Sequence, residues 1–172
     1  MQNMEAKPDR RRNWGSSFGK GEMMRVLTIC QPYAHLIAHG QKWVENRTWY
    51  TPYRGELLIH AGKSRDWIDF NESETADETY GIPVSEMEFG KIVAVARLDD
   101  CIQVDGVNRT SFDRIYPGFS EHVHVEGPFC WVLTNISRLK TPLPATGKQG
   151  IFSLDLLPST LGELIPVKQE RT

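Results

Sequence analysis

Short apolar stretches separated by polar turns run along this chain, and most of them have the length and composition of β-strands. Residues 91–98 and 130–136 are dense in β-branched side chains, which is typical of central strands. Residues 55–61 are apolar on both faces apart from Glu56 and His60, so this strand is expected to be buried on both sides. The predicted strands cover 26–29, 43–50, 55–61, 91–98, 130–136 and 150–157.

Two helices are predicted between these strands. The first begins at Pro32, which is favourable at a helix start, and ends at Gly40, where a left-handed cap is expected. Its core face holds Tyr33, Leu36 and Ile37, at spacings of three and four.

The second helix is predicted to begin at residue 65 or 66, with Ser64 as its N-cap. Trp67, Ile68 and Phe70 are expected to face the core. Between residues 66 and 88 the chain carries eight carboxylates and no lysine or arginine, so a nucleic acid is expected to approach from another side.

Several strands and two helices predict an α+β fold, a small mixed β-barrel flanked by two or more helices. Residues 105–127 contain few aliphatic side chains and predict a long surface loop. We expect three parts: a disordered basic tail over 1–24, one domain over 25–158, and a polar tail over 159–172.

The composition is that of a soluble protein, with 40% hydrophobic and 24% charged residues and a net charge of −2. The sequence has no apolar run of the roughly 18 residues that a membrane helix requires. Cys30, Cys101 and Cys130 are odd in number and widely spaced, which favours a reducing compartment over a disulfide framework or a zinc ribbon. We therefore expect a cytoplasmic protein, and the sequence leaves its oligomeric state open.

The stretch 31–55 concentrates charge and aromatic side chains. It reads Gln-Pro-Tyr, then Gly-x-Lys-x-x-Glu-x-Arg, then Trp-Tyr-Thr-Pro-x-Arg-Gly. This order resembles the signature of the ASCH domain, and the segment 141–155 is similar to that family's closing loop and last strand. The resemblance implies a PUA-like β-barrel associated with RNA.

With this resemblance, we expect the chain to bind RNA or single-stranded nucleic acid in a cleft beside the first helix. Glu45 and Arg47 lie two apart on a predicted strand and therefore share a face, where the carboxylate can hold the cations in place. Cations would contact phosphates and aromatic rings would stack on bases. The candidate binding residues are Gln31, Tyr33, Lys42, Arg47, Trp49, Arg54, Lys63, Lys148 and Gln149.

The sequence is also consistent with three other functions. Some ASCH-like proteins resemble amidohydrolases that act on acetylated cytidine, a modified nucleoside. Lys42 matches their lysine, but Glu45 stands where they have a threonine nucleophile. An enzyme of this kind would use Lys42 and Glu45 in catalysis. A ribonuclease would instead use Lys42, Arg47 and a tyrosine to stabilise the charge of the transition state. Neither enzyme would need a metal or a cofactor. A protein-interaction module would instead present an exposed apolar patch.

A metal site is not expected. His35 and His39 have the spacing of paired ligands on a helix, but position 36 is leucine and no third ligand is evident.

Overall fold

The computed structural model describes residues 23–68, 80–105 and 107–169. Most of the predicted tail 1–24, the predicted helix position Phe70 and part of the acidic stretch lie outside these residues.

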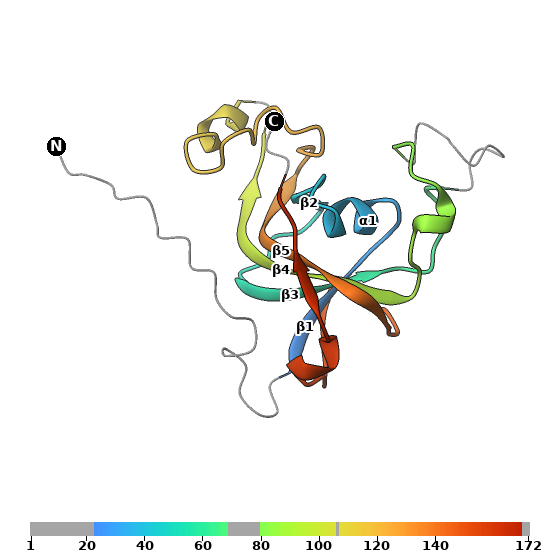
Figure 1. The fold of residues 1–172 in the computed structure, drawn as a ribbon. Coiled ribbons are helices and arrows are strands. Elements are labelled where there is room, and N and C mark those ends of the chain that lie inside the picture. The colour runs from blue at the N-terminus through green and yellow to red at the C-terminus, as the bar shows by residue number, and fades with distance from the viewer. Residues whose placement is uncertain (1–22, 69–79, 106, 170–172) are drawn as a thin grey trace.

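One mixed sheet of seven strands forms the fold, in the order β2-β5-β4-β3-β1-β6, with β7 also paired to β5 (Figure 1). The pair β1 and β3 is parallel, and the other pairs are antiparallel. The strands are β1 (Met24–Ile29), β2 (Val44–Arg47), β3 (Gly55–Ala61), β4 (Lys91–Gln103), β5 (Phe129–Pro144), β6 (Ile151–Leu154) and β7 (Leu164–Pro166).

The expected closed barrel is wrong, because the sheet is open. Closure requires the two end strands to pair with each other. Here β6 pairs with β1, both β2 and β7 pair with β5, and no ladder between described residues joins the two ends. The short end strands, of four residues in β2 and in β6, each support one ladder.

The predicted first helix is confirmed as α1 (Tyr33–Ala38), and Gly40 has the left-handed φ of 82° that its position requires. No second α-helix occurs in the described part of the chain, where residues 66–68 form a turn. The described residues instead form three short 3₁₀ helices: η2 (Val84–Glu86), η3 (Arg109–Phe112) and η4 (Pro158–Leu161). None of the described helices is long and apolar enough to span a membrane.

The core lies on both faces of the sheet, as the two-sided apolar pattern of 55–61 predicts. Leu57 and Ile59 pack on the face that α1 covers, and Leu58 packs on the opposite face. The loop 105–127 differs from the expected surface excursion, because Tyr116 and Phe119 are buried against the first face. These two aromatic rings provide the apolar area that the loop lacks in aliphatic side chains.

Candidate functional site

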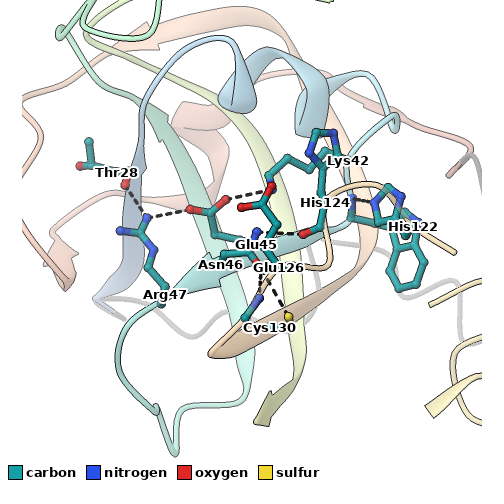
Figure 2. A network of polar contacts seen from close by, with 11 residues as sticks. Thr28, Lys42, Glu45, Asn46, Arg47, His122, His124, Glu126 and Cys130 are labelled. Carbon is teal, nitrogen blue, oxygen red and sulfur yellow. Dashed lines mark hydrogen bonds and ion pairs between the residues drawn. The ribbon is translucent and has the colours of Figure 1, made fainter. Parts of the chain in front are cut away.

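Strand β2 brings the predicted cations together around one carboxylate. Glu45 lies between Lys42 and Arg47, with 3.5 Å from its Oε2 to Lys42 Nζ and 3.2 Å from its Oε1 to Arg47 Nη2 (Figure 2). Arg47 Nη2 also donates a hydrogen bond of 2.9 Å to the carbonyl oxygen of Thr28 in β1. The predicted shared face of Glu45 and Arg47 is confirmed, and the guanidinium is held from two sides.

Lys42 lies beneath the surface. Its side chain is only 3% exposed, and Nζ lies 5.2 Å from the centre of the Tyr33 ring. An ammonium group in this position cannot reach the phosphates of a polymer directly. Its charge offsets that of Glu45, and Arg47 is the member of the group that faces solvent, with its side chain 23% exposed. The hydrolase alternative would use Lys42 and Glu45, and these two residues are ion-paired with each other.

Arg47 lines a cavity of about 760 Å³. Trp49 follows it at the end of β2, Lys63 comes from the turn after β3, and the loop 146–150 leads into β6. No carboxylate is among the lining residues of this part of the described structure. The lining residues are Thr28, Arg47, Trp49, His60, Gly62, Lys63, Thr146, Gly147, Lys148, Gln149 and Gly150.

Polar atoms in the wall of this cavity are buried without a hydrogen-bond partner in the described structure. They are Thr28 Oγ1, Arg47 Nε and His60 Nδ1. Thr28 and His60 are direct neighbours across the parallel pair of β1 and β3. Buried polar atoms are usually hydrogen-bonded, so three unpaired atoms in one wall are unusual. They are atoms to which a ligand could form hydrogen bonds.

Burial favours the neutral form of His60 at this wall. Burial lowers the pKa of His60, the positive charge of Lys63 lowers it further, and a hydrogen bond to the carbonyl of Ala145 opposes both. A neutral imidazole that donates from Nε2 to Ala145 O, at 3.1 Å, keeps Nδ1 as an acceptor.

Gly147 lets the loop 146–150 approach the sheet. A Cβ atom at this position would lie 2.6 Å from His60 Cε1 and 2.8 Å from Thr28 Oγ1, closer than real Cβ atoms come. The loop therefore covers His60 and Thr28 through bare backbone.

The remaining predicted binding residues lie elsewhere. The Gln31 side chain donates to Glu88 O at 2.7 Å and borders a smaller cavity of about 250 Å³ beside α1. Arg54 pairs with Asp100 at 3.0 Å and donates to the Thr51 carbonyl at 2.8 Å. Gln31 and Arg54 therefore connect parts of the fold.

Tyr33 lies in an aromatic group with Trp67, Tyr80 and His124, at ring-centre distances of 6.0–6.4 Å. Burial raises the pKa of Tyr33 to about 12, so its hydroxyl stays protonated at neutral pH. The rings of His35 and His39 stack at 4.0 Å. No group of three metal-ligating side chains was found among the described residues.

Thr28, His60 and Thr146 belong to the cavity but were not among the predicted residues. His60 gave a signal in the sequence, as a polar side chain that follows the apolar run 57–59. Gly147 was predictable as a glycine that lets the backbone come close to a ligand. Thr28 gave none, because a threonine in a strand is ordinary.

A loss of stability in acid is expected from the buried His122 and His124. Burial, and secondly the charge of Lys42, lowers the pKa of each to about 4 from 6.5. The unfolded chain binds protons more readily below pH 6.5, so this contribution is present above pH 6.5 and is lost as pH falls towards 4. At about 1.4 kcal/mol per pKa unit, the loss is up to about 3 kcal/mol for each histidine.

Urea unfolding across this pH range, for the wild type and His124→Gln, tests this expectation. The variant should lose less stability on acidification than the wild type. An identical pH dependence in the two proteins would show that His124 does not contribute.

Residues 27–142 match the ASCH domain family, and the chain belongs to that family. It is 29% identical over 131 residues to activating signal cointegrator 1 of Homo sapiens, and 30% identical over 132 residues to the protein of that name from Mus musculus. Each alignment covers 75% of this chain and 22% of the relative, so the chain spans about a fifth of the length of these relatives.

Solved structures of an ASCH protein from Zymomonas mobilis are also similar. One has a TM-score of 0.45 and 14% identity, covering 84% of this chain and 98% of that chain. A mutant of that protein has a TM-score of 0.47 and 12% identity, covering 80% and 92%.

Proposed function

We propose that this ASCH domain binds RNA or single-stranded nucleic acid through the cavity of Arg47, Lys63 and Lys148. One observation carries the proposal: three cations and Trp49 line a single cavity with no carboxylate among its lining residues. Membership of the ASCH family supports a nucleic-acid ligand at the level of the family. The PUA-like relationship of the fold stays a prediction.

Arg47 is the best placed of the three cations to recognise a phosphate. Nη2 is occupied by Glu45 and the Thr28 carbonyl, while Nε has no partner in the described structure. A guanidinium fixed on one side loses little conformational entropy when its other N–H groups bind an anion.

Trp49 is suited to stack on a base. It is 38% exposed and packs edge-on against the buried Trp131, with ring centres 4.7 Å apart at 89°. This contact fixes the indole while part of it stays open to solvent. Base stacking on such a ring contributes about 1 to 3 kcal/mol.

A single strand fits this site better than a duplex. The cavity volume lies in the range of roughly 300 to 1,000 Å³ that is typical of small-ligand pockets. A base can enter such a cavity only when it is free of a complementary strand. Since the net charge is −2, affinity should come from this local group of cations.

Fluorescence anisotropy with short labelled RNA, single-stranded DNA and duplex DNA, at two salt concentrations, tests the proposal. We expect binding to single strands that weakens with salt. The double variant Lys63→Ala with Lys148→Ala should bind more weakly, and the slope of log affinity against log salt should fall by about 1.4, or roughly 0.7 for each lost phosphate contact.

Lys140→Ala is the matched control. Lys140 is 60% exposed, pairs with Glu163 at 2.7 Å, and lies at the smaller cavity. Its loss should leave the slope unchanged. Equal effects of the double variant and the control, or no binding of any strand by the wild type, would contradict the proposal.

A further inference from the structure

The cavity carries more positive charge than an internal phosphate of a strand needs. Arg47, Lys63 and Lys148 bring three positive charges to its lining. The nearby carboxylate of Glu45 is already paired with both Lys42 and Arg47. A phosphodiester carries one negative charge, whereas a phosphate monoester carries about −1.5 to −2 at neutral pH and presents three acceptor oxygens.

Packing limits where these cations lie. The Lys63 stem lies along Gly90, since a Cβ there would be 2.7 Å from Lys63 Cε and 3.2 Å from Cγ. Lys148 Nζ lies 5.9 Å from the centre of the Phe152 ring. Arg47 is held by Glu45 and the Thr28 carbonyl. Partly fixed cations lose less entropy on binding an anion than freely moving ones.

Neutral donors are also available. Within the described residues, no backbone N–H from 146 to 150 donates to another backbone group or side chain. Arg47 Nε–H and the hydroxyl of Thr28 are also unpaired, and both atoms are buried in the wall of the cavity. Backbone N–H groups commonly bind phosphate oxygens, and three terminal oxygens can use more of them than the two of a diester.

The size of the cavity points to a chain end. A volume of about 760 Å³ holds a nucleotide-sized group, but it is not a groove that follows a strand over many nucleotides. From the charge, the donors and the volume together, we infer that the cavity recognises the phosphorylated end of a single strand. The phosphate monoester lies among Arg47, Lys63 and Lys148, and the terminal base lies against Trp49. This inference rests on the proposed function, because it names which part of the nucleic acid the same cavity binds.

Competition against an internally labelled single-stranded RNA tests the inference. The unlabelled competitors share one sequence and carry a 5′-phosphate, a 3′-phosphate, hydroxyls at both ends, or a 5′-phosphate blocked as its methyl ester. We expect one of the two phosphorylated strands to compete about tenfold better than the hydroxyl strand, given the additional charge and acceptor oxygen. If the 5′ end is preferred, the methyl ester should lose most of that advantage. It keeps the terminal phosphate group, but as a diester it carries about one negative charge fewer than the monoester.

Variants connect this preference to the cavity. The double variant Lys63→Ala with Lys148→Ala should lose the preference for a phosphorylated end, and Lys140→Ala should retain it. Equal competition by all four strands against the wild type would overturn the inference and leave the proposed function standing. Failure of the labelled RNA to bind at all would overturn the proposed function together with the inference. A preference retained in the double variant would show that the end is recognised elsewhere.

Discussion

Replacing Glu45 by alanine is expected to lower the free energy of unfolding by about 3 to 5 kcal/mol, because it leaves a buried cation without its counter-charge. Lys42 is 3% exposed, and Glu45 is its one ion-pair partner among the described residues. Arg47 loses the same partner and keeps its bond to the Thr28 carbonyl. Urea denaturation measures the change, as a lower midpoint at an unchanged slope.

Glu163→Ala is the control for this substitution. Glu163 also pairs with a lysine, Lys140, but the two side chains are 63% and 60% exposed. An ion pair in solvent contributes about 0 to 1 kcal/mol, so its loss should be small. Similar losses for Glu45→Ala and Glu163→Ala would mean that burial of the Lys42 charge is unimportant.

Gly147→Ala is expected to reduce the affinity for single-stranded RNA by about tenfold or more. The added Cβ would lie 2.6 Å from His60 Cε1, and the imidazole is buried and hydrogen-bonded to Ala145. The loop 146–150 must therefore move away from the sheet and take Lys148 with it. Such overpacking also costs about 1 to 3 kcal/mol of stability. Anisotropy titration and urea denaturation measure the two effects.

Gly150→Ala in the same loop is the control for Gly147→Ala, because it introduces backbone strain without a steric clash. Gly150 has a φ of 68°, and a Cβ there would meet nothing within 4 Å. This variant should lose about 1 kcal/mol through left-handed strain and retain more of its affinity than Gly147→Ala. If Gly150→Ala weakens binding as much as Gly147→Ala does, the contact of the loop with His60 is not what positions Lys148.

Local sequence patterns predict β1, α1 and β3 well. The apolar run before Gln31, the proline and glycine around α1, and the two-sided apolar character of β3 all correspond to observed elements. In these segments the local preference and the tertiary environment agree.

The longest strands and the topology were harder to predict. Strands β4 and β5 run well beyond the apolar runs 91–98 and 130–136, through polar residues such as Asp99, Asp100 and Ser137. Their ladder continues across several register shifts, which break the simple alternation that a strand prediction uses. Strand β7 lies in the segment 159–172 that was expected to be a polar tail, and it is only three residues long. Whether a sheet closes depends on whether its two end strands pair with each other. The apolar pattern of a single strand does not show which strand it pairs with.

The sequence predicted which residue types form the candidate site, but not which of them are buried. Arg47, Trp49, Lys63, Lys148 and Gln149 line one cavity, although they lie up to about a hundred positions apart in the sequence. Spacing alone gave no indication that Lys42 is buried, since its burial depends on residues distant in sequence, such as Tyr33 and the loop that carries the buried His122 and His124. Thr28 and His60 meet through the parallel pairing of β1 and β3, a non-local contact.

Mapping where nucleic acid binds on the folded protein tests directly whether the cavity is the binding site. Hydrogen–nitrogen correlation spectra, recorded during titration with a short single-stranded RNA, would report on the amides of 146–150 and on the unpaired Nε–H of Arg47. If nucleic acid binds in the cavity of Arg47, Lys63 and Lys148, these signals shift most, together with the amide of Lys63 and the indole N–H of Trp49. Shifts concentrated at the smaller cavity of His35 and Arg138, with the 146–150 amides unmoved, would contradict this prediction.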